Sequence, residues 1–233
     1  MLITGANKGL GRETARQLAA FGWTVLIGAR NADLGQATAD ELGTDGADVR
    51  FVQIDVTSDE SVAAAVQWVT AEVGRLDVLI NNAGIIGAQT SVLETGPADF
   101  LACFGVNLLG PVRVTRAFLP LLSKSELPRV VMVSSGLGSF NVTANPDRTE
   151  YGINSLVYPS SKSALNMVTT QYAKALPGWK INAADPGYTA TDLNGHRGHK
   201  TIPEGAAVIV ELATLHADGP TGGFFDDAGT VAW

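Results

Sequence analysis

Short apolar runs alternate with amphipathic segments along the whole chain. A strand inside a parallel sheet is buried on both faces, so it is a nearly continuous run of apolar residues. Such runs occupy residues 1–4, 23–28, 49–54, 76–81, 130–134 and 180–185. Helical spacing separates them, most clearly at Val62, Val66, Val69 and Val73. We therefore predict one α/β domain over residues 1–233, a doubly wound parallel sheet of about seven strands with helices on both faces.

Charge and composition narrow the class of partner. The 233-residue chain has a net charge of −7 and a pI near 4.9, which disfavours binding to nucleic acids or anionic membranes. No apolar run is long enough for a membrane span, and the N-terminus lacks a signal-peptide pattern. The single Cys103 predicts neither a disulfide framework nor a zinc site. We expect a cytoplasmic protein that acts on a small molecule; its abrupt start in an apolar strand suggests missing upstream residues.

A glycine-rich turn follows the first predicted strand. Residues 4–11 are Thr-Gly-Ala-Asn-Lys-Gly-Leu-Gly, and a helical pattern begins directly afterwards. Glycines let the backbone turn tightly beside a pyrophosphate, whose charge is bound by the free N–H groups at the start of the helix. The alternative is a tight strand-to-helix turn that binds nothing. The strand before it and the helix after it favour a dinucleotide site.

The end of the second predicted strand indicates which dinucleotide binds. NAD-binding versions of this fold place a carboxylate there for the ribose 2′-hydroxyl. This chain has Gly-Ala-Arg-Asn at residues 28–31, without an acid. Arg30 and Lys8 then offer charge-assisted contacts to a 2′-phosphate, which predicts NADP(H) as the cofactor. The alternative is that both are ordinary solvated cations.

Tyr158 and Lys162 are candidate catalytic residues. They are four positions apart at the start of a helical segment, so their side chains share one face. A phenol needs a nearby cation to act as an acid or base near neutrality, and Lys162 supplies one. This spacing alone is more often found on an ordinary solvated helix. The Ser-Ser-Gly at 134–136 and the Asn-Asn-Ala-Gly at 81–84 strengthen the case, because both follow apolar strands, where this architecture binds ligands.

Together these motifs resemble those of the short-chain dehydrogenase/reductase family, across essentially the whole chain. The resemblance is closest to the carbonyl reductase and menthone/salutaridine reductase branch. It implies a Rossmann fold and an NADPH-dependent oxidoreductase that reduces a ketone or aldehyde to an alcohol by hydride transfer. The matching motifs are Thr4 to Gly11, Asp55-Val56, Asn81 to Gly84, Asn107, Ser134-Ser135, Tyr158 with Lys162, and Asp185-Pro186-Gly187 followed by Thr191.

The resemblance also implies a role for each matched residue. Ser135 would polarise the carbonyl and Tyr158 would donate the proton. Lys162 would lower the tyrosine pKa and bind the nicotinamide ribose, and Asn107 would hold a water in a proton relay. Besides Tyr158 and Lys162, the expected cofactor contacts are Gly5, Asn7, Lys8, Gly9, Leu10, Gly11, Arg30, Asp55, Val56, Asn81, Ala83, Gly84, Pro186, Gly187, Thr189 and Thr191.

Two other functions compete with this interpretation. A catalytically silent NADP(H)-sensing regulator would keep the fold but lose the catalytic groups, whereas all four catalytic positions are present here. A sugar-nucleotide epimerase needs a substantial C-terminal substrate domain, for which the chain leaves no room. The substrate itself stays open, because the candidate pocket residues indicate only an apolar or aromatic ligand: Phe140, Tyr151, Ile153, Tyr188 and Leu193.

An inserted segment, residues 139–154, separates Ser135 from Tyr158. It lies in a Gly/Pro/Asn-rich stretch that we expect to be an irregular loop arching over the carbonyl pocket as a substrate-side flap. We expect its polar middle to be exposed and its apolar ends to face inward. The alternative is a surface excursion or a subunit contact. Its length matches neither the short tetrameric members nor the monomeric carbonyl reductases of the family, so both a monomer and a homo-oligomer stay open.

Overall fold

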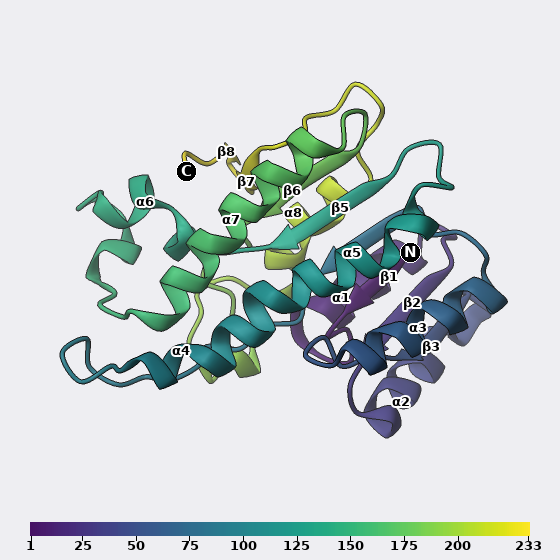
Figure 1. Cartoon of the computed structure of the whole chain (residues 1–233), viewed down its shortest axis with the longest axis horizontal. Helices are drawn as coiled ribbons and strands as arrows, with labels where there is room; N and C mark the ends of the chain where they lie inside the picture. Colours follow the sequence, from purple (N-terminus) through teal and green to yellow (C-terminus); the bar gives the residue numbers. More distant parts are fainter.

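The computed structural model contains one eight-stranded sheet (Figure 1). It describes residues 1–233, apart from the side chain of residue 45. The spatial order is β3-β2-β1-β4-β5-β6-β7-β8, and all neighbours pair in parallel except β7 with β8. The strands are β1 (Leu2–Thr4), β2 (Val25–Ala29), β3 (Val49–Gln53), β4 (Val78–Asn81), β5 (Arg129–Val133), β6 (Lys180–Ala184), β7 (Phe224–Asp226) and β8 (Gly229–Thr230).

The predicted fold class is confirmed, with a difference at one edge. Every predicted strand is present with its ends shifted by only a few residues. The last two strands were not individually predicted, because β7 and β8 are too short to show a periodic pattern. β8 turns back antiparallel on β7 after a short turn, in which the Ala228 N–H donates to Asp226 Oδ1 at 2.8 Å.

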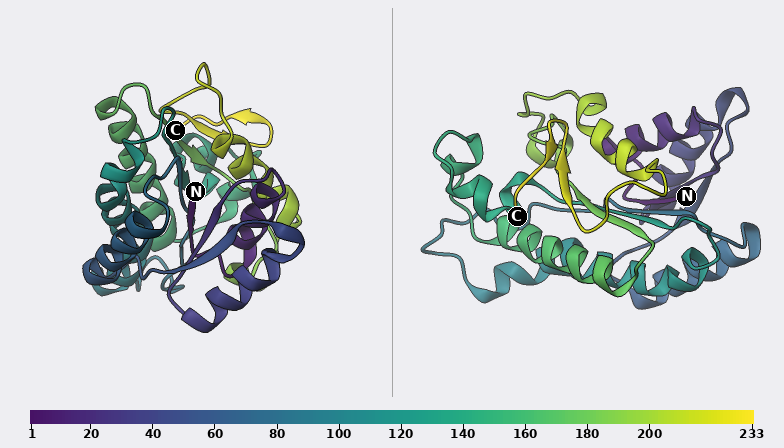
Figure 2. Two further views of the ribbon diagram at one scale, coloured as in Figure 1. Left: turned by 90° about the vertical axis from the view of Figure 1, so that its right-hand side faces the viewer. Right: turned by 90° about the horizontal axis from the view of Figure 1, so that it is seen from above.

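Helices cover both faces of the sheet (Figure 2). Neighbouring residues on a strand point to opposite faces, so Ile3 packs in the core beneath α1 and α8, while Leu2 packs in the core beneath α3, α5 and α7. No helix among the described residues is long and apolar enough to cross a membrane. The helices are α1 (Gly9–Ala19), α2 (Ala32–Leu42), α3 (Asp59–Glu72), α4 (Pro97–Phe104), α5 (Gly110–Leu122), α6 (Phe140–Ala144), α7 (Val157–Ala175) and α8 (Ile202–Ala213), with 3₁₀ turns at Thr44–Gly46, Gly136–Gly138, Thr149–Gly152 and Asp192–Asn194.

The inserted segment, which we call the flap (residues 139–154), is more ordered than predicted. It contains α6 and a 3₁₀ turn, and its expected orientation is wrong: Phe140, Tyr151 and Ile153 are 77%, 58% and 54% exposed. The inner face is instead made by Ser139 and Val142, which are buried. Ser139 caps α6 by accepting from the Val142 N–H and donates its hydroxyl to the Ala232 carbonyl at 2.6 Å, which turns the aromatic Phe140 outward.

Candidate active site

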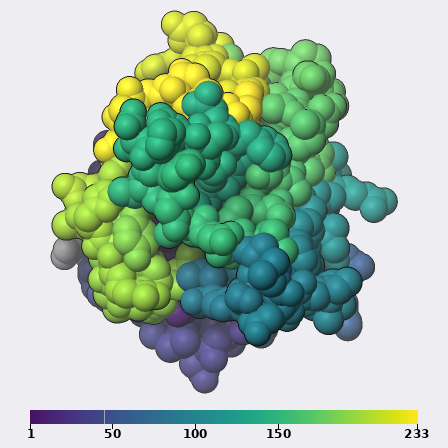
Figure 3. All heavy atoms as spheres, turned by 90° about the vertical axis from the view of Figure 1, so that its left-hand side faces the viewer, coloured from purple at the N-terminus to yellow at the C-terminus, as the bar shows by residue number. Residues whose placement is uncertain are grey.

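The turns after β1, β4, β5 and β6 meet at one edge of the sheet, as expected for parallel strands. Figure 3 looks onto this side of the molecule: the flap lies between the segment after β6, near residues 188–203, and the segment after β4, near residues 85–100. The candidate catalytic and cofactor residues come from these turns and from the helices that begin there. The candidate active site therefore lies at the carboxyl edge of the parallel sheet.

The glycine-rich turn is fixed against the turn after β4. Gly5 has a φ of +64°, and a Cβ there would come within 2.9 Å of the Ala83 Cα, so only glycine fits. Thr4 Oγ1 accepts the N–H groups of Asn82 and Ala83 at 3.0 and 3.1 Å, and Asn82 Nδ2 donates to the Thr4 carbonyl at 2.8 Å. Sequence reasoning assigned no individual role to Thr4 or Asn82. The sequence signal that could have identified them is a polar residue at or directly after the end of each of two neighbouring strands, β1 and β4.

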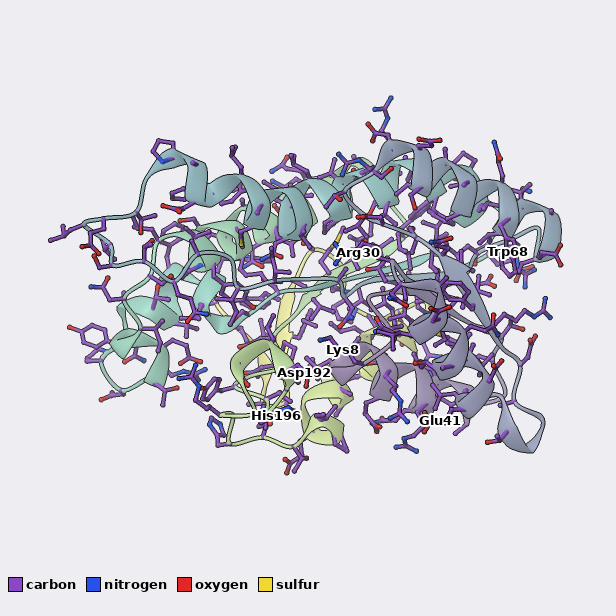
Figure 4. All side chains as sticks on the ribbon, turned by 90° about the horizontal axis from the view of Figure 1, so that it is seen from below. Lys8, Arg30, Glu41, Trp68, Asp192 and His196 are labelled. Atoms are coloured by element: carbon purple, nitrogen blue, oxygen red, sulfur yellow. The ribbon has the colours of Figure 1, made fainter. Side chains whose placement is uncertain are left out.

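The two cations predicted to bind a 2′-phosphate differ in their surroundings. Lys8 Nζ lies 3.0 Å from the Asp192 carboxylate, which is also 2.9 Å from His196 Nε2. Arg30 is exposed at the end of β2, and among the described side chains it has no ion-pair partner. Figure 4 shows Lys8, Asp192 and His196 together, with Arg30 apart from them. A 2′-phosphate would therefore meet no competing ion pair at Arg30 among the described side chains, whereas at Lys8 it would share the ammonium group with Asp192.

Two of the expected cofactor contacts, Asp55 and Asn81, also differ in their surroundings. Asp55 caps its own turn, since Oδ1 accepts the Thr57 hydroxyl and N–H at 2.7 and 2.9 Å, and these bonds lower the pKa of its carboxyl. The Asn81 side chain is buried and donates to Thr115 Oγ1 at 3.0 Å. The Asn81 side chain thus points to α5, so a cofactor contact from this residue would come from its backbone.

The turn after β6 packs beside the glycine-rich turn. Gly187 has a φ of +69°, and Thr189 Oγ1 donates to the Pro186 carbonyl at 3.0 Å. A Cβ at Gly9 would lie 3.8 Å from the methyl group of Thr191, so the two turns are in contact distance. The predicted cofactor residues from both ends of the chain are therefore neighbours.

Ser135, Tyr158 and Lys162 lie at the ends of β5 and α7. Lys162 is buried, donates from Nζ to the Val133 carbonyl at 2.8 Å, and lies 5.5 Å from the centre of the Tyr158 ring. Ser135 is partly exposed and accepts the Leu137 N–H through Oγ at 3.2 Å, so its own O–H is left to donate elsewhere. The structure thus brings these three predicted residues into one group.

Burial controls the protonation of this group. It raises the pKa of Tyr158 above the ordinary tyrosine value; the negative charge of Asp185 acts in the same direction, and the Ser135 hydroxyl opposes them. Burial also lowers the pKa of Lys162 from 10.5 to about 8, although Asp185 favours its charged form. At neutral pH the site therefore contains a protonated phenol beside an ammonium group.

Asn107 links the turn after β4 to α7. It lies in a π-helical turn, Gly105–Leu109, that joins α4 to α5, and it is fully buried. Its amide accepts the Ile85 N–H at 2.9 Å and donates to the Ile85 carbonyl at 2.8 Å and to Ser161 Oγ at 3.1 Å. Ser161 in turn donates to the Tyr158 carbonyl at 2.7 Å. The side chain predicted to hold a water thus also fixes the turn after β4 to the start of α7.

Comparisons with known proteins agree with this architecture. A model of the short chain dehydrogenase family matches residues 1–201. The chain is 35% identical to (−)-isopiperitenone reductase of Mentha piperita, over 96% of this chain and 95% of the relative. The solved structure of salutaridine reductase from Papaver somniferum has a TM-score of 0.82 at 28% identity, covering 97% of this chain and 98% of that chain. A short chain dehydrogenase from Shigella flexneri 2a, complexed with NADP, has a TM-score of 0.82 at 26% identity, covering 97% and 95%. The chain belongs to the short chain dehydrogenase family.

Proposed function

We propose that this protein is an NADPH-dependent reductase that converts a ketone or aldehyde to an alcohol, with Tyr158 as the proton donor. The observation that carries the proposal is the group formed by Ser135, Tyr158 and Lys162, in which a protonated phenol lies beside a buried cation. Its relatives include proteins named as reductases.

The residues present fit an NADP(H) cofactor. The positive-φ glycines 5 and 9 keep the start of α1 open to a pyrophosphate, whose charge the free N–H groups there attract. Arg30 is exposed at the end of β2, where a 2′-phosphate would bind, and residues 28–31 contain no acid that would repel this phosphate. When bound, this cofactor supplies the hydride. The Shigella flexneri relative, solved with NADP, supports the same cofactor class for this chain.

The protein's own residues then handle the oxygen of the substrate. The Ser135 hydroxyl donates a hydrogen bond to the carbonyl oxygen and orients it. As negative charge develops on that oxygen, the Tyr158 hydroxyl gives it a proton and becomes a phenolate. The Lys162 ammonium group, 5.5 Å from the ring centre, stabilises that phenolate. Asn107 and Ser161 hold the backbone of Tyr158 in place for this transfer.

A screen of NADPH oxidation tests the proposal. Aldehydes, quinones, cyclic ketones and keto esters are offered in turn, with NADH run in parallel. We expect turnover with at least one apolar or aromatic carbonyl compound and a preference for NADPH. Tight NADPH binding without turnover on any class would favour a cofactor-sensing regulator and would contradict the proposal.

A further inference from the structure

Asn166 is a buried polar residue of α7 that the proposed proton transfer does not use. It is 4% exposed and lies four positions after Lys162, so both side chains project from the same face of the helix. Asn166 Oδ1 accepts a hydrogen bond from the Ser134 hydroxyl at 2.6 Å, and Nδ2 donates to the Gly138 carbonyl at 3.2 Å. Ser134 and Gly138 lie on either side of Ser135 in the chain. One side chain of α7 therefore contacts both ends of the segment that carries Ser135.

This segment, which we call the Ser135 turn (residues 134–138), is tight and internally hydrogen-bonded. Its last three residues, Gly136–Gly138, form a 3₁₀ turn. The Gly138 N–H donates to the Ser135 carbonyl at 2.8 Å, and the Leu137 N–H donates to Ser135 Oγ at 3.2 Å. Because the turn is short, the Ser135 hydroxyl moves whenever either end of the turn moves.

The Ser135 turn packs closely on α7. A Cβ at Gly138 would come within 2.7 Å of the Lys162 carbonyl carbon and 2.8 Å of the Lys162 Cβ, so only glycine allows this approach. Ser163 Oγ also donates to the Gly138 carbonyl, at 2.9 Å. On the other side of the turn Gly136 contacts Asp185, because a Cβ at Gly136 would lie 2.8 Å from Asp185 Oδ2. The turn therefore lies between α7 on one side and the residue that follows β6 on the other.

We propose that Asn166 is a positioning residue, which fixes the Ser135 hydroxyl relative to the Tyr158 hydroxyl by holding the Ser135 turn on α7. The proposal rests on the proposed roles of Ser135 and Tyr158. Both hydroxyl groups must reach the oxygen of the same substrate, and a displacement of about 1 Å can lower the rate strongly. Lys162 joins the same two elements, since its Nζ donates to the Val133 carbonyl at 2.8 Å. Asn166, one helical turn later, adds a bond to the residue after Val133. Two successive turns of α7 thus hold the end of β5.

A double-mutant cycle tests whether Asn166 acts through Ser135. Asn166→Ala removes both bonds to the Ser135 turn, and kcat is compared in wild type, Asn166→Ala, Ser135→Ala and the double variant. We expect Asn166→Ala to lower kcat by about tenfold in the wild-type background and hardly at all in the Ser135→Ala background, because the group that it positions is absent there. The Kd for NADPH should change little. An equal loss of kcat in both backgrounds, as for a general structural role, or no loss in either, would overturn the proposal.

Thr169→Val is the matched control for the loss of a buried polar group on α7. Thr169 is fully buried, and its hydroxyl donates to the Leu165 carbonyl within the helix. This variant should keep the wild-type kcat. If Asn166→Ala does not fold, Ser134→Ala takes its place in the cycle with the same expectation, because it removes only the hydroxyl that bonds to Asn166 Oδ1.

Hydrogen exchange provides a second measurement that needs no turnover. The exchange of the amides at residues 135–139 is followed without substrate. It should be faster in Asn166→Ala or Ser134→Ala than in wild type, and unchanged in Thr169→Val. Unchanged exchange in the first two variants would mean that Asn166 does not hold the turn, and this too would overturn the proposal. Since exchange is measured without turnover, failure of the proposed reductase activity is a separate result.

Discussion

The two ends of the site contain similar charges in different surroundings. At the catalytic end, Lys162 is 4% exposed and lies 5.5 Å from the centre of the Tyr158 ring. At the phosphate end, the side chains of Lys8 and Asp192 are 64% and 51% exposed. Water and salt screen charges at the second end and hardly reach the first. Removing one charge should therefore change kcat strongly at the catalytic end, whereas at the phosphate end it should change only the affinity for the cofactor.

Tyr158→Phe should have the largest effect. It removes the proton donor and little else, so we expect kcat to fall by about 10²-fold or more while the Kd for NADPH is nearly unchanged. Steady-state kinetics and fluorescence titration with NADPH measure the two quantities. Tyr172→Phe is the control, because Tyr172 is on the same helix and its hydroxyl only donates to the Val112 carbonyl. A Tyr158→Phe enzyme that kept more than half of its kcat, with chemistry rate-limiting, would exclude this mechanism.

Lys162→Met should separate function from stability. We expect lower kcat and weaker NADPH binding, because the cation beside the phenol and the expected ribose contact are lost. The folded protein should nevertheless be more stable at pH 7, by about 2 kcal/mol. Burying the ammonium group destabilises the wild-type folded state, and the hydrogen bond to the Val133 carbonyl, which the variant loses, offsets only part of that penalty.

The pH dependence provides the check on Lys162→Met. The pKa of Lys162 falls from 10.5 to about 8 on folding, so the folded state binds fewer protons between those values and wild-type stability rises with pH there. The stability advantage of the variant should then shrink as the pH rises from 8 towards 10.5. Urea unfolding at several pH values measures it. Lys174→Met, at an exposed position of α7, should show no such trend.

The difference between the two ends also separates what the sequence predicts from what it does not. Apolar periodicity and glycine spacing are local, so they predicted the parallel sheet, the turn before α1 and the shared face of Tyr158 and Lys162. The ion pair of Lys8 with Asp192 and the contact of Asp185 with Gly136 join positions far apart in the chain, and no local pattern encodes them. The predicted orientation of the flap was wrong for the same reason, because the observed orientation depends on the hydrogen bond from Ser139 to the Ala232 carbonyl.

Arg30→Ala tests the phosphate end. Arg30 is exposed and, within the described part of the chain, has no ion-pair partner, so its positive charge should contribute to NADPH binding and not to NADH binding. We expect kcat/KM for NADPH to fall by about tenfold, with the value for NADH unchanged. The loss should become smaller at high salt, in contrast to the loss in Tyr158→Phe. An unchanged preference between the cofactors would show that Arg30 does not read the 2′-phosphate.

Asp192→Asn should have the smallest effect, and in the opposite direction. Asp192 holds Lys8 at 3.0 Å and His196 at 2.9 Å, so a 2′-phosphate must compete with a carboxylate for the Lys8 ammonium. Exposed pairs of this kind are weak, so removing the carboxylate should lower the Kd for NADPH by only about twofold and leave the Kd for NADH nearly unchanged. Titration at low and high salt tests this, because screening should remove the gain. His196→Ala is the control: it leaves the pair of Lys8 with Asp192 intact and should not tighten NADPH binding. Weaker binding of both cofactors in Asp192→Asn would instead mean that the pair closes over the dinucleotide and does not compete with its phosphate.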